Sequence, residues 1–265
     1  MLESVSAVRF DRRMSSGKSW PCLLECERSS GEEVEVVAKF SAGFERKVGG
    51  LVAEAVAAML AADLNIPVPE PFLVHVDDDF IELVRQLDAP LATKMTNSPR
   101  VAFGSRKLPP GFMTHAPDLA LKHERLTQAA EIFAFDALIQ NSDRRPENPN
   151  CLSDGRNFAA IDHELAFMTE GILLWQPPWK TGSLEHCKTS NRHLFFSALK
   201  GKRVDYSSFE RSWLNISDQR LSEYRSAIPP EWSSANNVAL SATNLIKDIR
   251  DNISPALAEV RRVLG

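Results

Sequence analysis

The most informative segment of this chain reads Asn141-Ser142-Asp143-Arg144-Arg145-Pro146-Glu147-Asn148-Pro149-Asn150. It is polar, charged and proline-rich, and it follows directly on residues 124–140, whose apolar side chains recur at helical spacing. The segment therefore predicts a loop at the end of a long helix. Within it, Asp143 and Asn148 lie five residues apart, a spacing that a solvated turn can also show.

The types and spacing of these two residues suit phosphoryl transfer. That chemistry needs a carboxylate to accept a hydroxyl proton and oxygen ligands to hold magnesium near the phosphates. Protein kinases supply these groups as an aspartate and an asparagine at this same spacing in a catalytic loop. We therefore predict Asp143 as the catalytic base and Asn148 as a catalytic residue that binds magnesium.

A second acid follows fourteen residues after Asn148, at the end of a predicted strand. In Ala159-Ala160-Ile161-Asp162-His163-Glu164, apolar residues lead into Asp162. The magnesium-binding aspartate of a protein kinase has the same setting, so Asp162 is predicted as a catalytic and metal-binding residue. An ordinary turn acid would look the same in isolation, and the His-Glu continuation departs from the common Phe-Gly.

Two charged residues stand alone in apolar segments upstream. Lys39 lies in Val36-Val37-Ala38-Lys39-Phe40, and Glu54 is the one charged residue between Leu51 and Ala62. A buried unpaired charge is strongly unfavourable, so each residue needs a partner. Pairing Lys39 with Glu54 satisfies both and directs the ammonium group toward ATP phosphates. The alternative is that each side chain reaches solvent independently.

The nearest candidate for a phosphate-binding loop before Lys39 is Arg13-Met14-Ser15-Ser16-Gly17-Lys18-Ser19. It has a single glycine in place of a Gly-x-Gly-x-x-Gly pattern. Such a loop could bind phosphate through backbone N–H groups, serine hydroxyls and a lysine. We therefore predict nucleotide binding by Ser15, Ser16, Gly17 and Lys18, with a plain serine-rich turn as the alternative.

The order of the predicted elements favours an α+β protein with segregated halves. The first hundred residues contain strands and one helix, whereas the chain beyond Glu124 is mainly helical. Pro, Gly, Ser and Thr are frequent between Leu87 and His115, and we place the boundary near Phe103-Gly104-Ser105. Predicted strands cover 21–27, 33–40, 72–76 and 158–162, predicted helices cover 51–63, 124–140, 207–214, 219–227, 235–250 and 255–264, and Asp77-Asp78-Asp79 is predicted as a turn.

Composition narrows the classes of function. The net charge of −4, without a long run of one sign, argues against avid nucleic-acid binding. No apolar run approaches the roughly 20 residues that span a bilayer, and the first five residues do not resemble a signal peptide. We expect a cytoplasmic protein without a membrane span. Cys22 and Cys26 lack the spacing of a zinc site, so we expect them to be small core residues on one strand.

Three other features have ordinary interpretations. Asp136, near the end of the predicted helix, is expected to hydrogen-bond the backbone of the following loop. Trp175 and Trp179 are expected to pack on the surface rather than form a lip for substrate. Residues 168–178 form a short, apolar stretch, so a long phosphorylatable activation loop is not expected.

The combined pattern resembles a known family. Asn141-Ser142-Asp143-Arg144-Arg145 with Asn148 after it, followed by Ile161-Asp162-His163, resembles the HipA-like kinase family. The likeness spans nearly the whole chain, because further segments are similar to those of the family. These segments are Ala38-Lys39-Phe40, Glu54, Leu64-Asn65-Ile66-Pro67-Val68-Pro69, Phe103-Gly104-Ser105 and Ile228-Pro229-Pro230-Glu231-Trp232.

The resemblance implies a two-lobed protein-kinase-like fold. A β-rich N-lobe with one helix would cover residues 1–103, and a mainly helical C-lobe would cover residues 104–265. ATP and Mg²⁺ would be the cofactors, and a serine hydroxyl on a protein would be a frequent acceptor. We therefore expect an ATP-dependent serine/threonine protein kinase acting on a protein substrate, with an antitoxin or another regulatory protein as a further expected partner.

Two alternatives stay open at this point. One is a lipid or small-molecule kinase, because phosphatidylinositol kinases carry a similar Asp-Arg loop. The other is a pseudokinase that serves as a nucleotide-binding interaction module without turnover, and the weak phosphate-binding loop favours it.

Overall fold

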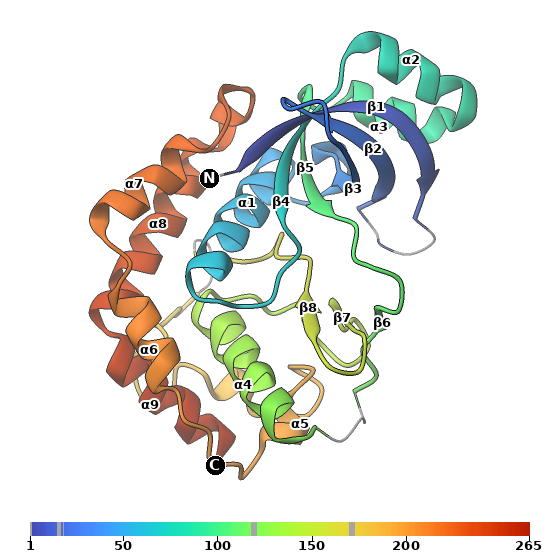
Figure 1. Cartoon of the computed structure of the whole chain (residues 1–265). Helices are drawn as coiled ribbons and strands as arrows, with labels where there is room; N and C mark the ends of the chain where they lie inside the picture. The colour runs from blue at the N-terminus through green and yellow to red at the C-terminus, as the bar shows by residue number, and fades with distance from the viewer. Residues whose placement is uncertain (1, 15–16, 18, 118–120, 170–172) are drawn as a thin grey trace.

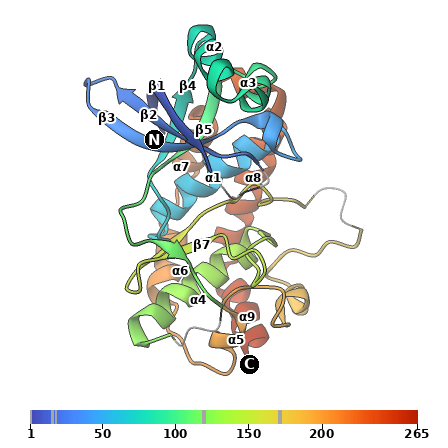
Figure 2. The same ribbon diagram turned by 90° about the vertical axis from the view of Figure 1, so that its right-hand side faces the viewer.

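The computed structural model describes residues 2–14, 17, 19–117, 121–169 and 173–265 (Figure 1). Its N-terminal part is rich in strands and its C-terminal part is mainly helical, which confirms the predicted α+β class. Figure 2 shows the strands of the N-terminal part in the upper half and most helices of the C-terminal part in the lower half, with helix α1 (Val48–Asp63) between them.

The N-terminal part is built on a closed barrel with the strand order β1-β2-β3-β5-β4. Neighbouring strands are antiparallel except β1 and β4, which are parallel. Apolar side chains fill the barrel, and Gly104 is needed there because an added Cβ would lie 2.5 Å from Val36 and 2.6 Å from Val74. The strands are β1 (Glu3–Arg13), β2 (Cys22–Arg28), β3 (Glu33–Lys39), β4 (Pro71–His75) and β5 (Val101–Arg106).

Strand β1 has no counterpart among the predicted strands. Val5 is its one buried residue, so it lacks the apolar alternation that predicts a strand. Its extended conformation follows from backbone pairing with β2 on one side and β4 on the other. Cys22 and Cys26 are buried and free, on the inner face of β2 as expected.

The prediction of a single helix in the N-terminal part is wrong. Besides α1, the structure has α2 (Asp78–Leu87) and α3 (Ala89–Thr96) beside the barrel, where a turn and an irregular region were expected. Asp77 begins α2 by accepting the backbone N–H of Phe80 at 2.7 Å, and Asp88 begins α3 by accepting that of Leu91 at 3.1 Å. Aspartates interpreted as turn residues are therefore helix N-caps.

The C-terminal part combines one small sheet with helices. The sheet has the order β6-β7-β8, and α4 packs against β8. Its elements are β6 (Met113–Thr114), α4 (His123–Leu138), β7 (Cys151–Ser153), β8 (Phe158–Ala160), η2 (Glu185–Cys187), α5 (Phe196–Leu199), α6 (Ser207–Leu214), α7 (Asp218–Ser226), η3 (Pro230–Ala235), α8 (Asn236–Asp251) and α9 (Ile253–Leu264). No helix among the described residues is both long enough and apolar enough to cross a membrane.

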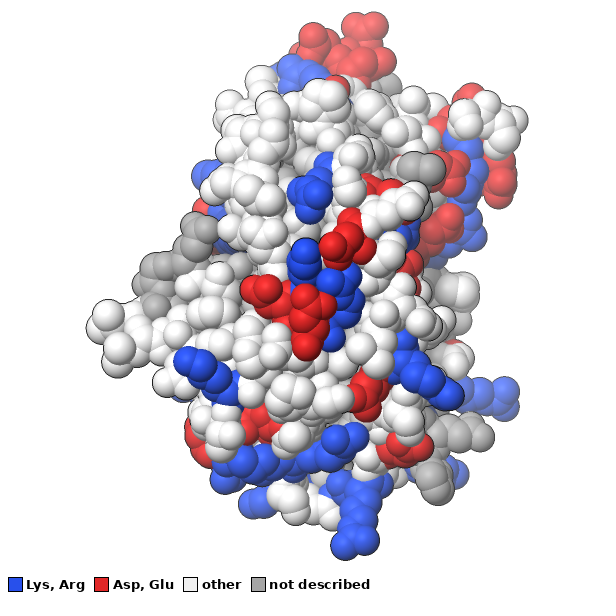
Figure 3. Space-filling view, turned by 90° about the vertical axis from the view of Figure 1, so that its left-hand side faces the viewer, with Lys and Arg blue, Asp and Glu red and all other residues white. Residues whose placement is uncertain are grey.

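Helix α1 is enclosed by both parts of the molecule. All residues from Gly49 to Ala61 are buried, against β4 and β5 on one side and against η3 and α8 on the other. At its C-terminal end, Asp63 accepts hydrogen bonds from Arg220 Nε at 2.6 Å and from the Tyr224 hydroxyl at 2.5 Å. The helix is thus held in one position by α7 and α8. On the outer face beside these helices, acidic and basic side chains lie interspersed (Figure 3).

Candidate active site

Three charged side chains from separate elements meet where the barrel faces the helical part. Lys39 ends β3, Glu54 lies midway along α1, and Asp162 follows β8. Lys39 Nζ is 2.5 Å from Glu54 Oε1 and 2.9 Å from Asp162 Oδ1. The structure therefore brings two predicted nucleotide-binding residues together with one predicted metal ligand.

The alternation of β3 explains the position of Lys39. Val36 and Ala38 are fully buried inside the barrel, so Lys39 projects from the opposite face of the strand. Glu54 is buried in an apolar helix, and its second oxygen, Oε2, accepts the backbone N–H of His163 at 2.9 Å. Each of the two lone charges therefore has the partner that its burial requires.

Lys39 and Asp162 hold each other in their charged forms, whereas burial raises the pKa of Glu54 above its usual range although Lys39 opposes that shift. Burial alone would lower the pKa of Lys39, but the carboxylates of Asp162 and Glu54 raise it above its usual range. Burial alone would raise the pKa of Asp162, but the ammonium group of Lys39 lowers it below its usual range. The site therefore presents a permanent positive charge next to an ionised carboxylate.

Asp143 and Asn148 form a second group of contacts in the loop after α4. Asn148 Nδ2 donates to Asp143 Oδ2 at 2.8 Å, and Asn150 Nδ2 donates to the same oxygen at 3.1 Å. Arg145 Nη2 donates to Asp143 Oδ1 at 3.2 Å, and the backbones of Arg145 and Asn148 pair in a short bridge. Asn150, for which the sequence predicts no role, is thus a further contact of the predicted base.

A cleft of about 290 Å³ opens beside the Lys39 cluster, between the barrel and the small sheet. Lys39 and Asp162 both line it. Its other lining is largely apolar and comes from β3, the loop between β1 and β2, the chain after β5, and the small sheet. These residues include Met14, Pro21, Val37, Leu108, Phe112, Leu152 and Ile161. The cleft thus joins an apolar surface to a charged one.

Comparison with known proteins assigns this arrangement to a family. The sequence model of the HipA-like kinase family matches residues 7–259, which is nearly the whole chain. The chain belongs to the HipA-like kinase family. This HipA-like kinase is accordingly a protein-kinase-like phosphotransferase.

One solved structure agrees on the fold. The proinflammatory kinase CtkA of Helicobacter pylori aligns over 97% of this chain and 99% of its own, with 11% identity and a TM-score of 0.51. At that identity the likeness shows the kinase fold alone. A Golgi casein kinase with Mn/ADP bound aligns over 99% of this chain and 72% of its own, with 12% identity and a TM-score of 0.44. A search among curated proteins gives no match.

The predicted phosphate-binding loop joins β1 to β2 at the edge of the cleft. Ser15, Ser16 and Lys18 lie outside the described residues. Gly17 has a φ of +107°, a conformation that favours glycine, and an added Cβ would meet the ring of Pro21 at 3.0 Å. Glycine therefore suits position 17 of the HipA-like kinase.

Asp136 bonds the loop backbone through its main-chain oxygen, which accepts the N–H of Asn141 at 2.8 Å, but the prediction is wrong for its side chain. Its carboxylate contacts side chains rather than the loop backbone: Arg144 Nε donates to Oδ2 at 2.6 Å, Asn141 Nδ2 donates to Oδ1 at 2.7 Å, and His193 Nε2 lies 3.1 Å from Oδ2. Asp136 and Arg144 are both fully buried. The signal in the sequence is Asp136, a lone acid in an apolar helix segment, with Arg144 eight residues later as a possible partner.

His163 and Glu164 complete the surroundings of Asp162 in this HipA-like kinase. Burial and the nearby charge of Arg144 lower the pKa of His163 to about 3, so its ring is neutral at physiological pH. Burial and the charge of Asp162 raise the pKa of Glu164 to about 7. Arg46, just before α1, donates to the backbone oxygen of Glu164 at 2.9 Å.

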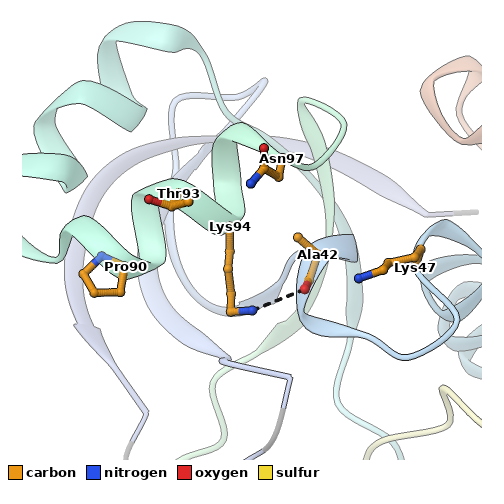
Figure 4. Close-up of a pocket in the computed structure, with 6 residues that line it drawn as sticks. All are labelled: Ala42, Lys47, Pro90, Thr93, Lys94 and Asn97. Carbon is orange, nitrogen blue, oxygen red and sulfur yellow. Dashed lines mark hydrogen bonds between the residues drawn. The ribbon is translucent and has the colours of Figure 1, made fainter.

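A separate hollow of about 480 Å³ lies between α3 and the start of α1 (Figure 4). It is lined by Ala42, Lys47, Pro90, Thr93, Lys94 and Asn97. Lys94 Nζ donates to the backbone oxygen of Ala42 at 3.3 Å and lies over the ring of Trp20. None of the predicted site residues lines this hollow, so the candidate active site is the cleft with Lys39 and Asp162.

Proposed function

We propose that this HipA-like kinase transfers the γ-phosphate of ATP to a serine or threonine hydroxyl of a protein substrate. One observation carries the proposal: Lys39 Nζ lies 2.5 Å from Glu54 and 2.9 Å from Asp162. A lysine on a strand, fixed by a helix glutamate and placed beside a metal-binding aspartate, is the arrangement that protein kinases need for ATP phosphates.

The cleft supports ATP as the phosphate donor. Its apolar walls suit the adenine ring, and the charged end with Lys39 suits the phosphates. We assign the loop containing Ser15, Ser16, Gly17 and Lys18 to the phosphates as well, where backbone N–H groups and a lysine would bind them. Lys39 would contact the phosphates, and Glu54 would hold Lys39 in place.

Asn148 and Asp162 fit a magnesium ion. An amide oxygen and a carboxylate oxygen are hard ligands of the kind that Mg²⁺ prefers. Among the described residues, no three His, Cys, Asp or Glu side chains form a dedicated metal site. That is compatible with Mg²⁺, which in kinases uses one or two protein carboxylates together with phosphate oxygens and water. When bound, the ion would neutralise charge on the phosphates.

Asp143 is the residue that we assign as the base. Asn148, Asn150 and Arg145 hold its carboxylate in one orientation. An ionised carboxylate offers about four acceptor positions, so three donors leave room for the hydroxyl of a substrate. Asp143 would orient that hydroxyl and accept its proton as the oxygen attacks the γ-phosphate.

A groove next to Asp143 supports a protein acceptor. It has a volume of about 620 Å³ and includes Ser142, the residue before the base. Leu173 and Leu174, which also line it, are 88% and 87% exposed, more than any other large apolar residue described. Exposed apolar side chains at such a groove favour a protein segment with an apolar residue near its hydroxyl.

The division into lobes belongs to the same proposal. The sequence places it between residues 103 and 104, and β5 runs through that point to Arg106. Because one barrel strand cannot belong to two lobes, we propose that the N-lobe ends with β5. The chain after β5 then connects to the C-lobe along the edge of the cleft.

The test is phosphate transfer from γ-labelled ATP by the wild-type chain and by Asp143→Asn. Protein, phosphoinositide and aminoglycoside acceptors are offered separately. Labelled phosphoserine or phosphothreonine on the protein, absent with Asp143→Asn, is the expected result. Transfer to the lipid or the aminoglycoside alone would replace the protein acceptor. Binding of ATP without transfer to any acceptor would indicate a pseudokinase and would refute the proposal.

A further inference from the structure

Arg144 is a fully buried side chain whose guanidinium group contacts both the loop that holds Asp143 and the residues next to Asp162. It directly follows Asp143 in the chain. Its Nη1 donates to the backbone oxygens of Asn150 and Ile161, the latter at 3.0 Å, and its Nη2 lies 2.9 Å from His163 Nε2. One side chain therefore bonds the end of the catalytic loop and the residues on both sides of Asp162.

Asp162 needs such support because its backbone is in the left-handed region. Its φ is +64°, a conformation that is unfavourable for a residue other than glycine. The carbonyl before it accepts from Arg144, and the N–H of His163 after it donates to Glu54 at 2.9 Å. The peptide groups on both sides of Asp162 are thus fixed by the side chains of Arg144 and Glu54.

The tautomer of His163 follows from the same contacts. Arg144 can only donate, so His163 Nε2 is the acceptor and the ring hydrogen lies on Nδ1. Glu54 Oε2 lies 3.9 Å from that nitrogen. A continuous chain of contacts therefore runs from Lys39 through Glu54 and His163 to Arg144.

Asp136 compensates the buried charge of Arg144. Its carboxylate accepts hydrogen bonds from Arg144 Nε at 2.6 Å and from Arg144 Nη2 at 3.2 Å, and this two-point contact also fixes the plane of the guanidinium group. A buried ion pair adds little stability compared with a well-packed apolar pair of the same size. Because the buried pair adds little stability and its arginine bonds the residues on both sides of Asp162, we infer that it positions this part of the chain.

We propose that Arg144 is a positioning residue that sets the carboxylate of Asp162 against the catalytic loop. This inference rests on the proposed kinase function and adds a residue that touches neither substrate nor metal. The planar, five-donor guanidinium group is essential to it, because a lysine in the same place cannot bond Asp136, Ile161 and His163 in fixed directions.

The test compares Arg144→Lys with Arg250→Lys. Like Arg144, Arg250 bonds a backbone oxygen, that of Ile216 at 2.9 Å, and a carboxylate, that of Asp218 at 2.7 Å, but it lies on α8, which carries none of the predicted site residues. Calorimetry measures the affinity for ATP with Mn²⁺ and without metal, steady-state kinetics give kcat and the KM of the protein acceptor, and thermal unfolding gives Tm. Losing a residue that supports metal ligands typically costs about 10- to 100-fold in metal affinity or activity.

For Arg144→Lys we expect weaker Mn·ATP binding and a lower kcat by about ten-fold or more, with unchanged affinity for metal-free ATP and unchanged acceptor KM. Arg250→Lys should lower Tm without changing the Mn·ATP affinity or kcat. Normal Mn·ATP affinity and kcat in Arg144→Lys would overturn the positioning role and leave the kinase function intact. A wild-type chain that binds no Mn·ATP would overturn both.

A second variant covers the case in which Arg144→Lys does not fold. His163→Leu removes the ring acceptor for Arg144 but keeps the backbone N–H that bonds Glu54. It should show the same selective loss of Mn·ATP affinity with a smaller magnitude. Unchanged Mn·ATP affinity in a folded His163→Leu variant would contradict the proposal.

Discussion

Replacing Lys39 by methionine should make the stability of the fold depend on pH. The change leaves Glu54 and Asp162 facing each other without their shared cation, and the side chain of Glu54 is only 3% exposed. One of the two carboxyl groups must then take up a proton. From an ordinary glutamate pKa of about 4.3, protonation costs about 4 kcal/mol at pH 7 and about 1 kcal/mol at pH 5.

The sign follows from the direction of the pKa shifts. In the wild type the pKa of Asp162 is lowered, so its contribution to stability is present above the unfolded pKa and is lost as pH falls. In the wild type, burial already raises the pKa of Glu54 and Lys39 opposes the shift. In Lys39→Met that opposition is lost and the pKa rises further, so stability is present at low pH and is lost as pH rises. The gap in free energy of unfolding between the two proteins should therefore widen from pH 5 to pH 8.

Urea unfolding at both pH values measures that gap. Lys247→Met is the matched control, because Lys247 pairs with Asp218 on the surface and such pairs contribute about 1 kcal/mol or less. ATP binding should be weak in Lys39→Met at both pH values. Glu54→Gln should lower the rate of phosphate transfer less than Lys39→Met does, because Lys39 keeps its contact with Asp162. Equal destabilisation at pH 5 and pH 8 would refute the reasoning about the buried charges.

Two other predictions concern the edges of the site. Autophosphorylation at Ser15 or Ser16 would add roughly two negative charges beside the nucleotide and should inhibit the enzyme; mass spectrometry after incubation with ATP checks this, and unmodified serines in an active enzyme would exclude it. Leu173→Ser combined with Leu174→Ser should raise the KM for a serine peptide with a neighbouring leucine by about ten-fold, at unchanged kcat. The control is Leu240→Ser, which changes an exposed leucine on α8, and an equal rise in KM there would refute peptide binding in the groove.

The sequence predicted what local patterns encode. Lys39 and Glu54 are lone charges in apolar segments, and the structure has them in contact. Helices of the C-terminal part, such as α6 at Ser207–Leu214, follow the apolar periodicity closely. The roles of the site residues stay predictions.

Other features depend on pairings that a single sequence does not display. Strand β1 is ordered by backbone bonds to two neighbours, and most of its side chains are exposed. The ion pair of Asp136 and Arg144 needs the loop after α4 to fold back onto the helix, which also brings in His193 from a distant segment. Asp77 and Asp88 show a local ambiguity instead, because an aspartate suits a turn and a helix N-cap equally.

The most direct test of the account separates Asp143 from Asp162. Calorimetry measures Mg·ATP affinity for Asp143→Asn and Asp162→Asn, and a transfer assay runs on the same samples. Asp143→Asn should bind Mg·ATP normally and lose about 10² to 10⁴ in transfer rate, whereas Asp162→Asn should lose Mg·ATP affinity and transfer together. Normal binding by Asp162→Asn with weakened binding by Asp143→Asn would reverse the roles, and normal binding and transfer by both would contradict the account.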